Sequence, residues 1–411
     1  MHLTLRSSRA VLSCMVVAMS LACAGNARAA QCENNEYPFP YSDVAGVPFA
    51  FCFGILQSYV MGITRGTTPT TFTPDADVTR LQMTTFLQRS MDQSLKRTSR
   101  RMALGQWWTP SYSPDHLQRV TLPVAPGMNP PGLIGHCRAD GERIWVASGN
   151  RLNSVQASTG EVMANAFFGP AIADLHDVLV AHGRVFMAGP VAQFIVPIRP
   201  KWAEPFTETS QGSFVPYRPA KLAFDGRMLW TANTLDNSIS RLVMFNGTLT
   251  FANTLTGFIE PTDVAYDGSY IWVAEAGGAN RLRKLDTNGM PLQTVAVGVN
   301  PTSITYDGAN LWVTNADSNS ITVISAASGT VIATIASNIS NALMQPAHAA
   351  FDGERILVVN RGNEAVTLFR AADLALIDWV STGAGSQPYG ACSDGINFWV
   401  TLRGTRELLR F

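Results

Sequence analysis

The sequence predicts a mainly β protein: a seven-bladed β-propeller preceded by a small α-helical domain. Three observations lead to this prediction. An Asp-Gly pair recurs about every forty residues, the runs between these pairs are rich in β-branched and aromatic residues, and the region before the first pair has apolar residues at helical spacing.

The Asp-Gly pair marks the period of the repeat. Successive marks are 40 to 45 residues apart, with His182-Gly183 in one of the seven places. The six aspartates are Asp140, Asp225, Asp267, Asp307, Asp352 and Asp394. Regular spacing of this length indicates an array of small supersecondary units.

Each unit is predicted to be a four-stranded antiparallel sheet. Asp-Gly between two apolar runs is a strong hairpin signal, because glycine accepts the positive φ of a tight turn. An aromatic residue follows five positions after most of the aspartates: Trp145, Trp230, Trp272, Trp312 and Trp399. One such sheet cannot bury its own faces, but seven around an axis can, with the tryptophans packed between neighbouring blades.

The final unit has room for only three strands, at 389–392, 397–401 and 407–411. Ahead of the first full unit, residues 117–125 read LQRVTLPVA and form a strand without an obvious partner. We therefore expect 117–125 to supply the fourth strand of the last blade and to close the ring.

The units resemble YVTN-type β-propeller repeats. The name is nearly spelled by Trp312-Val313-Thr314-Asn315, and Ser320-Ile321-Thr322-Val323-Ile324 is similar to the next strand of that family. The resemblance covers residues 116–411 and implies a binding or scaffolding module of a kind that is often exported in bacteria.

Residues 1–29 have the pattern of a signal peptide. Arg6 and Arg9 precede a short apolar run, and Ala27-Arg28-Ala29 is a small-x-small cleavage site, so the mature chain is expected to begin near Ala30. A lipoprotein site at Cys23 is an alternative with a poor preceding sequence. The predicted location is the periplasm, the cell surface or the medium, and no transmembrane segment is predicted.

Four cysteines remain after cleavage, an even number that permits disulfides in an exported chain. Cys137 lies three residues before its Asp and Cys392 two before its own, which places them on opposite sheet faces. Adjacent blades touch through opposite faces, so these two could meet where the ring closes, leaving Cys32 and Cys52 as the other pair. The alternative is a pair of buried free thiols at the seam.

Residues 30–107 are predicted to form a helix–loop–helix domain, before a propeller at 108–411. Apolar residues recur at helical spacing between Val47 and Met61. The second helix begins with a capping box, in which Thr79 is the cap and Gln82 lies three residues later.

This region resembles one S-layer homology repeat. Four segments carry the resemblance: Tyr41-Ser42-Asp43-Val44, Gly62-Ile63-Thr64-Arg65-Gly66, Phe72-Thr73-Pro74-Asp75 and Val78-Thr79-Arg80. The resemblance implies attachment to cell-wall polysaccharide, and by position the residues that hold the polymer would be Arg80, Thr64, Arg65 and Gly66. An arginine suits capture of carboxylate or phosphate groups.

Two departures from that family leave an alternative open. Leu81-Gln82 replace its Ala-Glu, and only one repeat is present where wall-binding members usually have three. In the alternative, Arg80 packs within its own domain and the module does not bind sugar.

A ring of polar residues is the best candidate ligand site in the propeller. The positions four residues before each turn are equivalent and should converge near the axis: His136, Val178, Lys221, Asp263, Ser303, His348 and Gly390. Five of the seven are polar, which predicts a ligand or metal site at the channel mouth, while a protein or small ligand is the expected partner of the propeller face. Alternatively, these side chains simply face water in the channel.

The composition argues against nucleic acid as a partner, since 30 basic and 30 acidic residues give no net charge. No catalytic, cofactor or phosphate-binding motif is present, and no metal-ligand set is predicted. We therefore expect an envelope-associated binding or scaffold protein that needs no cofactor.

An enzymatic reading is kept as the alternative. Streptogramin lyases are seven-bladed propellers with similar repeats, and they imply a metal and paired histidines. His348 lies at a comparable Pro-x-His position, and Glu275 follows Trp272-Val273-Ala274, but the two residues belong to blades two apart. A calcium-dependent lactonase meets the same difficulty, because few acidic residues lie at the expected mouth.

Overall fold

The computed structural model divides the chain into two compact units, residues 1–96 and 97–411. We call them the N-terminal unit and the propeller unit. The structure describes residues 30–32, 35–37, 41–48, 51–52, 55, 64, 67–68, 70–78, 83, 118–123, 134–157, 159–168, 175–181, 183–189, 193–198, 213–215, 217–245, 248–336 and 342–411. The predicted signal peptide at 1–29 lies outside these residues.

Seven four-stranded antiparallel sheets make up the described part of the propeller unit. Blade 1 contains β4 (Ile134–Ala139), β5 (Arg143–Ser148), β6 (Arg151–Gln156) and β7 (Val162–Phe167). Blade 2 contains β8 (Asp177–Ala181), β9 (Arg184–Ala188), β10 (Phe194–Ile198) and β11 (Ser213–Phe214). Blade 3 contains β12 (Lys221–Phe224), β13 (Met228–Asn233), β14 (Ser238–Phe245) and β15 (Thr248–Leu255), with the 3-10 turn η2 (Thr234–Asp236).

The remaining blades follow the same order. Blade 4 contains β16 (Pro261–Tyr266), β17 (Ile271–Glu275), β18 (Arg281–Leu285) and β19 (Pro291–Ala296). Blade 5 contains β20 (Pro301–Tyr306), β21 (Asn310–Asn315), β22 (Ser320–Ser325) and β23 (Val331–Ala336). Blade 6 contains β24 (Pro346–Phe351), β25 (Arg355–Asn360), β26 (Ala365–Arg370) and β27 (Leu376–Ser381). Blade 7 contains β28 (Pro388–Ser393), β29 (Phe398–Leu402), β30 (Glu407–Arg410) and β3 (Gln118–Thr121).

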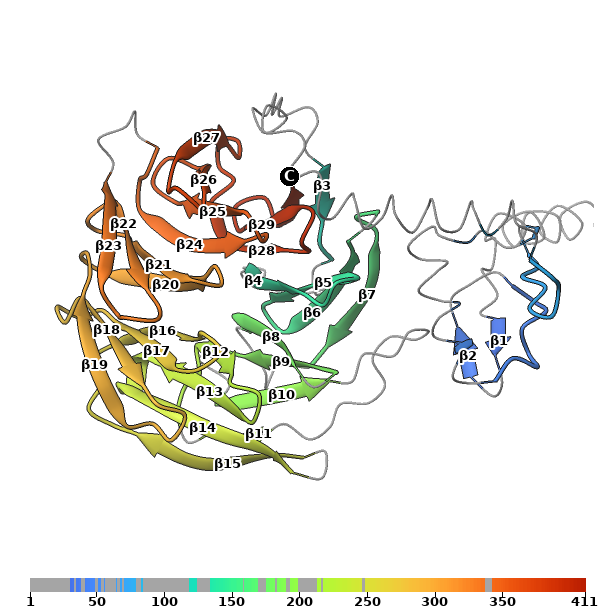
Figure 1. Ribbon diagram of the computed structural model, residues 1–411, viewed down its shortest axis with the longest axis horizontal. Helices are drawn as coiled ribbons and strands as arrows, with labels where there is room; N and C mark the ends of the chain where they lie inside the picture. Colours follow the sequence, from blue (N-terminus) through green and yellow to red (C-terminus); the bar gives the residue numbers. More distant parts are fainter. Residues whose placement is uncertain are drawn as a thin grey trace, which may run out of the picture. The chain divides into compact units, whose positions relative to one another are not determined.

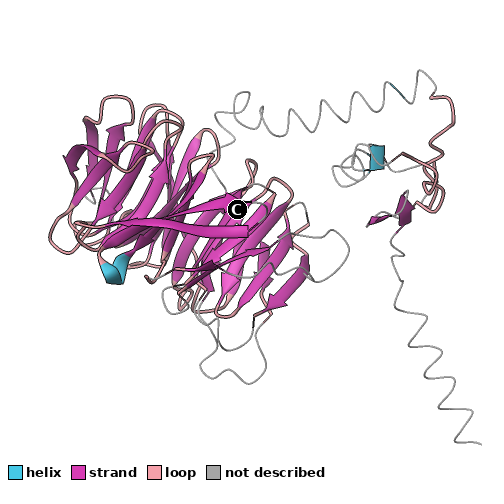
Figure 2. Cartoon of the chain, turned by 90° about the horizontal axis from the view of Figure 1, so that it is seen from below, coloured by secondary structure: helices cyan, strands magenta, loops and turns pink. Residues whose placement is uncertain are grey.

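The blades stand around a common centre, with the first strand of each blade innermost (Figure 1). Every inner strand contacts the inner strand of the next blade, and β28 contacts β4 to complete the circle. Strands dominate the described residues of this unit, as Figure 2 shows. The seven-bladed propeller predicted from the repeat is confirmed.

The core lies between the blades rather than at the axis. Each pair of neighbouring blades shares one cluster of buried apolar side chains, as in the cluster of Trp312, Ile321 and Val358 between blades 5 and 6. The five repeated tryptophans have no exposed surface. They fill the space between blades, as expected from the inability of a single sheet to bury its faces.

The Asp-Gly turn and the tryptophan are joined by a hydrogen bond. In blade 5, Asp307 accepts bonds from the backbone N–H of Ala309 and Asn310, and its second oxygen accepts from Trp312 Nε1 at 2.7 Å. The same indole bond occurs at the other four tryptophans. The carboxylate therefore shapes the turn and satisfies the one polar atom of a buried indole.

Ring closure follows the prediction. β3 pairs antiparallel with β30, and Val120 lies opposite Leu408. Arg119 adds an ion pair to Glu407 at 2.7 Å and donates to the Thr382 carbonyl at 2.7 Å. The Cys137–Cys392 disulfide joins the inner strands of blades 1 and 7 at the same seam.

In the N-terminal unit, β1 (Ala30–Cys32) pairs with β2 (Asn35–Tyr37), and the predicted Cys32–Cys52 disulfide is present. Of the predicted helices, the described residues include Phe51, Cys52, Ile55 and Met83, and all four are helical. The remaining residues of those helices lie outside the described part. Among the described residues, no helix has the length and apolar character needed to span a membrane.

Candidate functional site at the propeller axis

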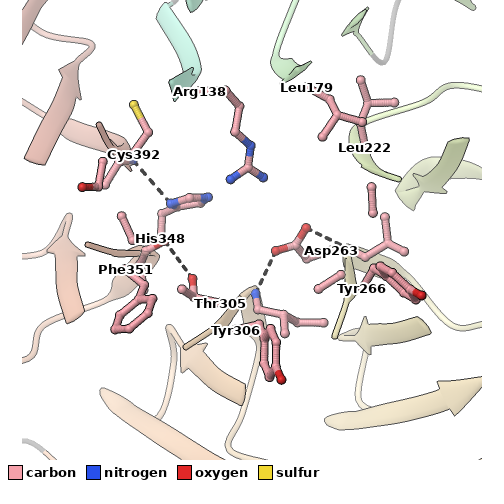
Figure 3. A pocket seen from close by; sticks show the side chains of 18 of the residues that line it. Arg138, Leu179, Leu222, Asp263, Tyr266, Thr305, Tyr306, His348, Phe351 and Cys392 are labelled. Carbon is pink, nitrogen blue, oxygen red and sulfur yellow. Dashed lines mark hydrogen bonds between the residues drawn. The ribbon is translucent and has the colours of Figure 1, made fainter. Parts of the chain in front are cut away.

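A cavity of about 410 Å³ opens at the end of the channel where the inner strands reach their Asp-Gly turns (Figure 3). Five of its lining side chains are charged or titratable: Arg138, Asp263, His348, Tyr266 and Tyr306. The two tyrosine hydroxyls donate to the Gly268 and Gly308 carbonyls. Much of the remaining wall is apolar and includes Leu179, Leu222, Val264 and Ile304. A concave site with a few convergent polar groups is typical of small-ligand binding.

Behind this cavity, three predicted ring residues come together. Lys221 Nζ lies 2.5 Å from His136 Nε2, and the His136 and His348 rings are 4.5 Å apart. An ammonium group can only donate, so His136 Nε2 accepts the bond and the ring carries its proton on Nδ1. The blades thus bring side chains from β4, β12 and β24 into one cluster.

Two ring residues, Asp263 and His348, and the neighbouring Asp177 join one inner strand to the next. The Leu222 N–H donates to Asp177 at 2.8 Å, the Ile304 N–H donates to Asp263 at 2.8 Å, and the Ala391 N–H donates to His348 Nδ1 at 3.3 Å. In each case the donor lies on the inner strand of the following blade. Inner strands have a free edge within their own sheet, and these side chains satisfy backbone groups on that edge.

Arg138 differs from the other charged residues around the axis. Its guanidinium points toward the centre of the cavity in Figure 3, and no described residue forms a hydrogen bond or ion pair with it. Asp263 lies in the same cavity, but its two oxygens accept the backbone N–H groups of Ile304 and Val264. The cavity therefore contains an arginine without a protein acceptor among the described residues.

A second cluster occupies the opposite end of the channel, where the inner strands begin. Arg403 Nη2 donates to His176 Nε2 at 2.5 Å, and the Tyr389 hydroxyl lies 2.8 Å from the same nitrogen. The Arg403 guanidinium also lies 3.1 Å from the centre of the Tyr389 ring and donates through Nε to the Ile134 carbonyl. This cluster holds blades 7, 1 and 2 together by cation–π and hydrogen-bond contacts.

The three channel histidines are held neutral. Burial, followed by the charge of Lys221, lowers the pKa of His136 and His348 well below the usual value. Burial, followed by the charge of Arg403, lowers the pKa of His176 to about 3. Because His348 Nδ1 accepts the Ala391 N–H, its proton is on Nε2, which is free to donate into the cavity.

The lowered pKa of His176 predicts a loss of stability in acid. Below pH 6.5 the unfolded chain takes up a proton that the folded protein refuses until about pH 3, so the free energy of unfolding falls as the pH falls through this window. The contribution is about 1.4 kcal/mol per pH unit. The free energy of unfolding can be measured by urea at several pH values between 6 and 4. Its slope against pH should be smaller in His176→Gln than in the wild type by this amount.

Other groups do not disturb that comparison. Asp263 and Glu142, whose pKa values are raised by burial, act in the opposite direction but contribute equally to both proteins. An unchanged slope in His176→Gln would contradict the prediction.

Two further members of the ring, Gly390 and Ser303, are buried away from the cavity. A side chain at Gly390 would meet His136 Nδ1 at 2.7 Å, so this glycine makes room for the histidine across the closing seam. Ser303 is 1% exposed, and its hydroxyl has no partner among the described residues. Neither residue lines the cavity.

Sequence reasoning did not identify Arg138, His176, Tyr389 or Arg403. Arg138 could have been found, because it lies two residues after His136 and strand side chains alternate between faces. The other three lie where the inner strands enter the channel, next to a register shift between Pro388 and Gly390. Such a shift breaks the simple alternation on which the prediction of the ring depended.

The candidate wall-binding residues are only partly described. Thr64 is 6% exposed, whereas Arg65, Gly66 and Arg80 lie outside the described residues. Nearby, the Asp43 carboxylate accepts the backbone N–H groups of Phe72 and Thr73 at 2.7 to 3.1 Å.

Glu275, the residue considered as a metal ligand, forms ion pairs with two arginines of its own blade. It has no exposed surface, pairs with Arg281 and Arg283 at 2.8 and 2.9 Å, and accepts the Ile259 N–H. Within the described ranges, no group of three or more His, Cys, Asp or Glu side chains is placed to hold a metal ion.

Comparison with known proteins identifies the fold. No family model and no curated protein matches the sequence. Among solved structures, hydrazine synthase of Kuenenia stuttgartiensis matches with a TM-score of 0.57 and 15% identity, over 71% of this chain and 97% of that one. The Cps50 (Swd1) β-propeller domain of Myceliophteria thermophila matches with a TM-score of 0.57 and 10% identity, over 68% and 97%. At these identities the likeness is that of the propeller fold.

Proposed function

We propose that the protein is an exported binding protein of the cell envelope. In this proposal the propeller holds a ligand or protein partner and the N-terminal unit attaches to wall polysaccharide. The observation that carries the proposal is the cavity at the axis, where the Arg138 guanidinium has no hydrogen bond or ion pair with any described residue and faces the open space. The propeller fold fits an interaction platform, because its packed blades present loops and strand ends as a rigid surface.

Two features support export. Residues 1–29 have the order of a signal peptide, and all four cysteines after Ala30 form disulfides. Disulfides persist in oxidising compartments and are rare in reducing ones. The periplasm, the cell surface and the medium all meet this requirement.

The YVTN resemblance is supported by the environment of Asn315. This residue ends the Trp312–Asn315 segment, has no exposed surface, and donates from Nδ2 to Ser320 Oγ at 3.3 Å and Thr322 Oγ1 at 3.0 Å. Asn233 makes the equivalent bonds to Ser238 and Ser240 in blade 3. The asparagine therefore joins the second and third strands of a blade, which gives a physical reason for the recurring sequence.

The wall-attachment part of the proposal is supported by Asp43. Its bonds to Phe72 and Thr73 bring together two of the segments that resemble an S-layer homology repeat. In this proposal Arg80 and Arg65 supply the charge that captures the polymer.

Sedimentation with purified cell walls tests this attachment. The mature chain should pellet with the walls, and Arg80→Ala should bind about tenfold more weakly, since a charge-assisted contact contributes 1.5 to 3 kcal/mol. Arg227→Ala, at an exposed turn of blade 3, is the matched control and should bind like the wild type. Failure of the wild-type protein to pellet would remove wall attachment from the proposal.

A further inference from the structure

The axial cavity has features that select a chemical class of ligand, and the selection rests on the binding role proposed above. Besides four hydroxyls that already donate to backbone carbonyls, its polar side-chain groups are two donors and one acid: the Arg138 guanidinium, the His348 Nε2–H and the Asp263 carboxyl. Of these, Asp263 already accepts two backbone N–H groups, whereas neither of the other two has a partner at these atoms among the described residues.

Unpaired donors in a half-enclosed space favour an anion. A guanidinium removed from water loses hydration energy, and a bound carboxylate restores it with charge-assisted hydrogen bonds. His348 is 4% exposed, so its donor direction is fixed by packing and by the Ala391 N–H on the opposite ring nitrogen. The site is therefore built before any ligand arrives.

The charge on the ligand is limited by Asp263. A doubly charged phosphate would lie in the same small cavity as this carboxyl. The repulsion between like charges in one cavity grows with the charge on the ligand. A singly charged carboxylate gains the contact with Arg138 at a smaller cost. Lys221 lies behind the cavity against His136 and adds a favourable positive potential.

Aliphatic residues form another part of the wall. Leu179, Leu222, Val264 and Ile304 line the cavity from four successive inner strands, although their side chains also pack into the clusters between blades. We infer that the axial cavity binds a small monocarboxylate, with its carboxylate on Arg138 and His348 and the rest of the molecule beside these four residues. A volume of about 410 Å³ is sufficient for a single aromatic ring with its carboxylate.

Calorimetry with the mature full-length chain tests the inference, with benzoate as the probe. Benzoate should bind with saturation, whereas benzamide, its neutral counterpart, and inorganic phosphate should bind at least tenfold more weakly. Arg138→Gln should weaken benzoate by about tenfold or more. The matched control is Arg227→Gln, which removes one positive charge from an exposed turn and should leave binding unchanged.

A crystal soaked in 4-bromobenzoate gives a second measurement that does not depend on the folding of a variant. The bromine anomalous peak should lie in the axial cavity, with the carboxylate against Arg138. A peak only elsewhere, equal binding of benzoate and benzamide, or unchanged benzoate binding in Arg138→Gln would each overturn the inference. Wall sedimentation does not involve Arg138, so that assay separates failure of this site from failure of the proposed function.

Discussion

Trp312→Ala is expected to lower the free energy of unfolding of the propeller by about 3 to 5 kcal/mol. Trp312 has no exposed surface and packs against Phe369 of the next blade, with ring centres 6.0 Å apart. Removing a buried indole leaves a cavity that a sheet interface can only partly close. Guanidinium unfolding followed by far-ultraviolet circular dichroism measures the loss.

The hydrogen bond to Asp307 can be separated from the packing. Trp312→Phe keeps most of the buried volume but removes the Nε1 donor, so we expect a loss of about 1 to 2 kcal/mol. Trp379→Ala is the matched control, because this tryptophan is 44% exposed on the outer strand β27. Similar losses for Trp312→Ala and Trp379→Ala would show that inter-blade packing does not stabilise the ring as described.

Removing the disulfide at the seam is expected to have the second large effect. The double substitution Cys137→Ala with Cys392→Ala should lower the free energy of unfolding by about 2 to 5 kcal/mol. The bond joins residues 255 positions apart, so its loss releases a long loop in the unfolded chain. The folded ring should remain closed, because β3 still pairs with β30.

The control for this experiment is the other disulfide. Cys32→Ala with Cys52→Ala alters the N-terminal unit and should leave the unfolding transition of the propeller unchanged. When Arg119→Ala is added to the seam double mutant, the total loss in free energy of unfolding should differ from the sum of the separate losses. The two changes should not be additive, since both affect one seam. An unchanged propeller transition without Cys137 and Cys392 would contradict the assigned role of the bridge.

The architecture of the propeller could be predicted because every unit repeats the same local chemistry. Asp-Gly fixes a turn, and the tryptophan five residues later requires a neighbour that covers it. The same reasoning placed Cys137 and Cys392 on facing sheet surfaces, since alternation along a strand is a local property. A missing strand at one end and an unpaired strand at the other then predicted the closure by β3.

The site was less accessible to sequence reasoning. Aligning equivalent positions of the repeat identified His136, Lys221, Asp263 and His348. The alignment did not show which of these residues use their polar atoms to join neighbouring inner strands. That assignment depends on how one blade is offset from the next, a geometric property of the closed ring. The position of Arg138 could have been predicted from strand alternation, but its lack of a protein acceptor could be recognised only after the bonds of Asp263 were known.

Closure by β3 also has a consequence for biosynthesis. Arg119 and its partner Glu407 are 288 positions apart, which corresponds to roughly 15 to 60 s of translation. Throughout that interval β30 has not been synthesised, so β3 has no partner strand. Its unpaired backbone groups could form hydrogen bonds with other nascent chains. Factors that keep the polypeptide extended until β30 has emerged should therefore raise the yield of native protein.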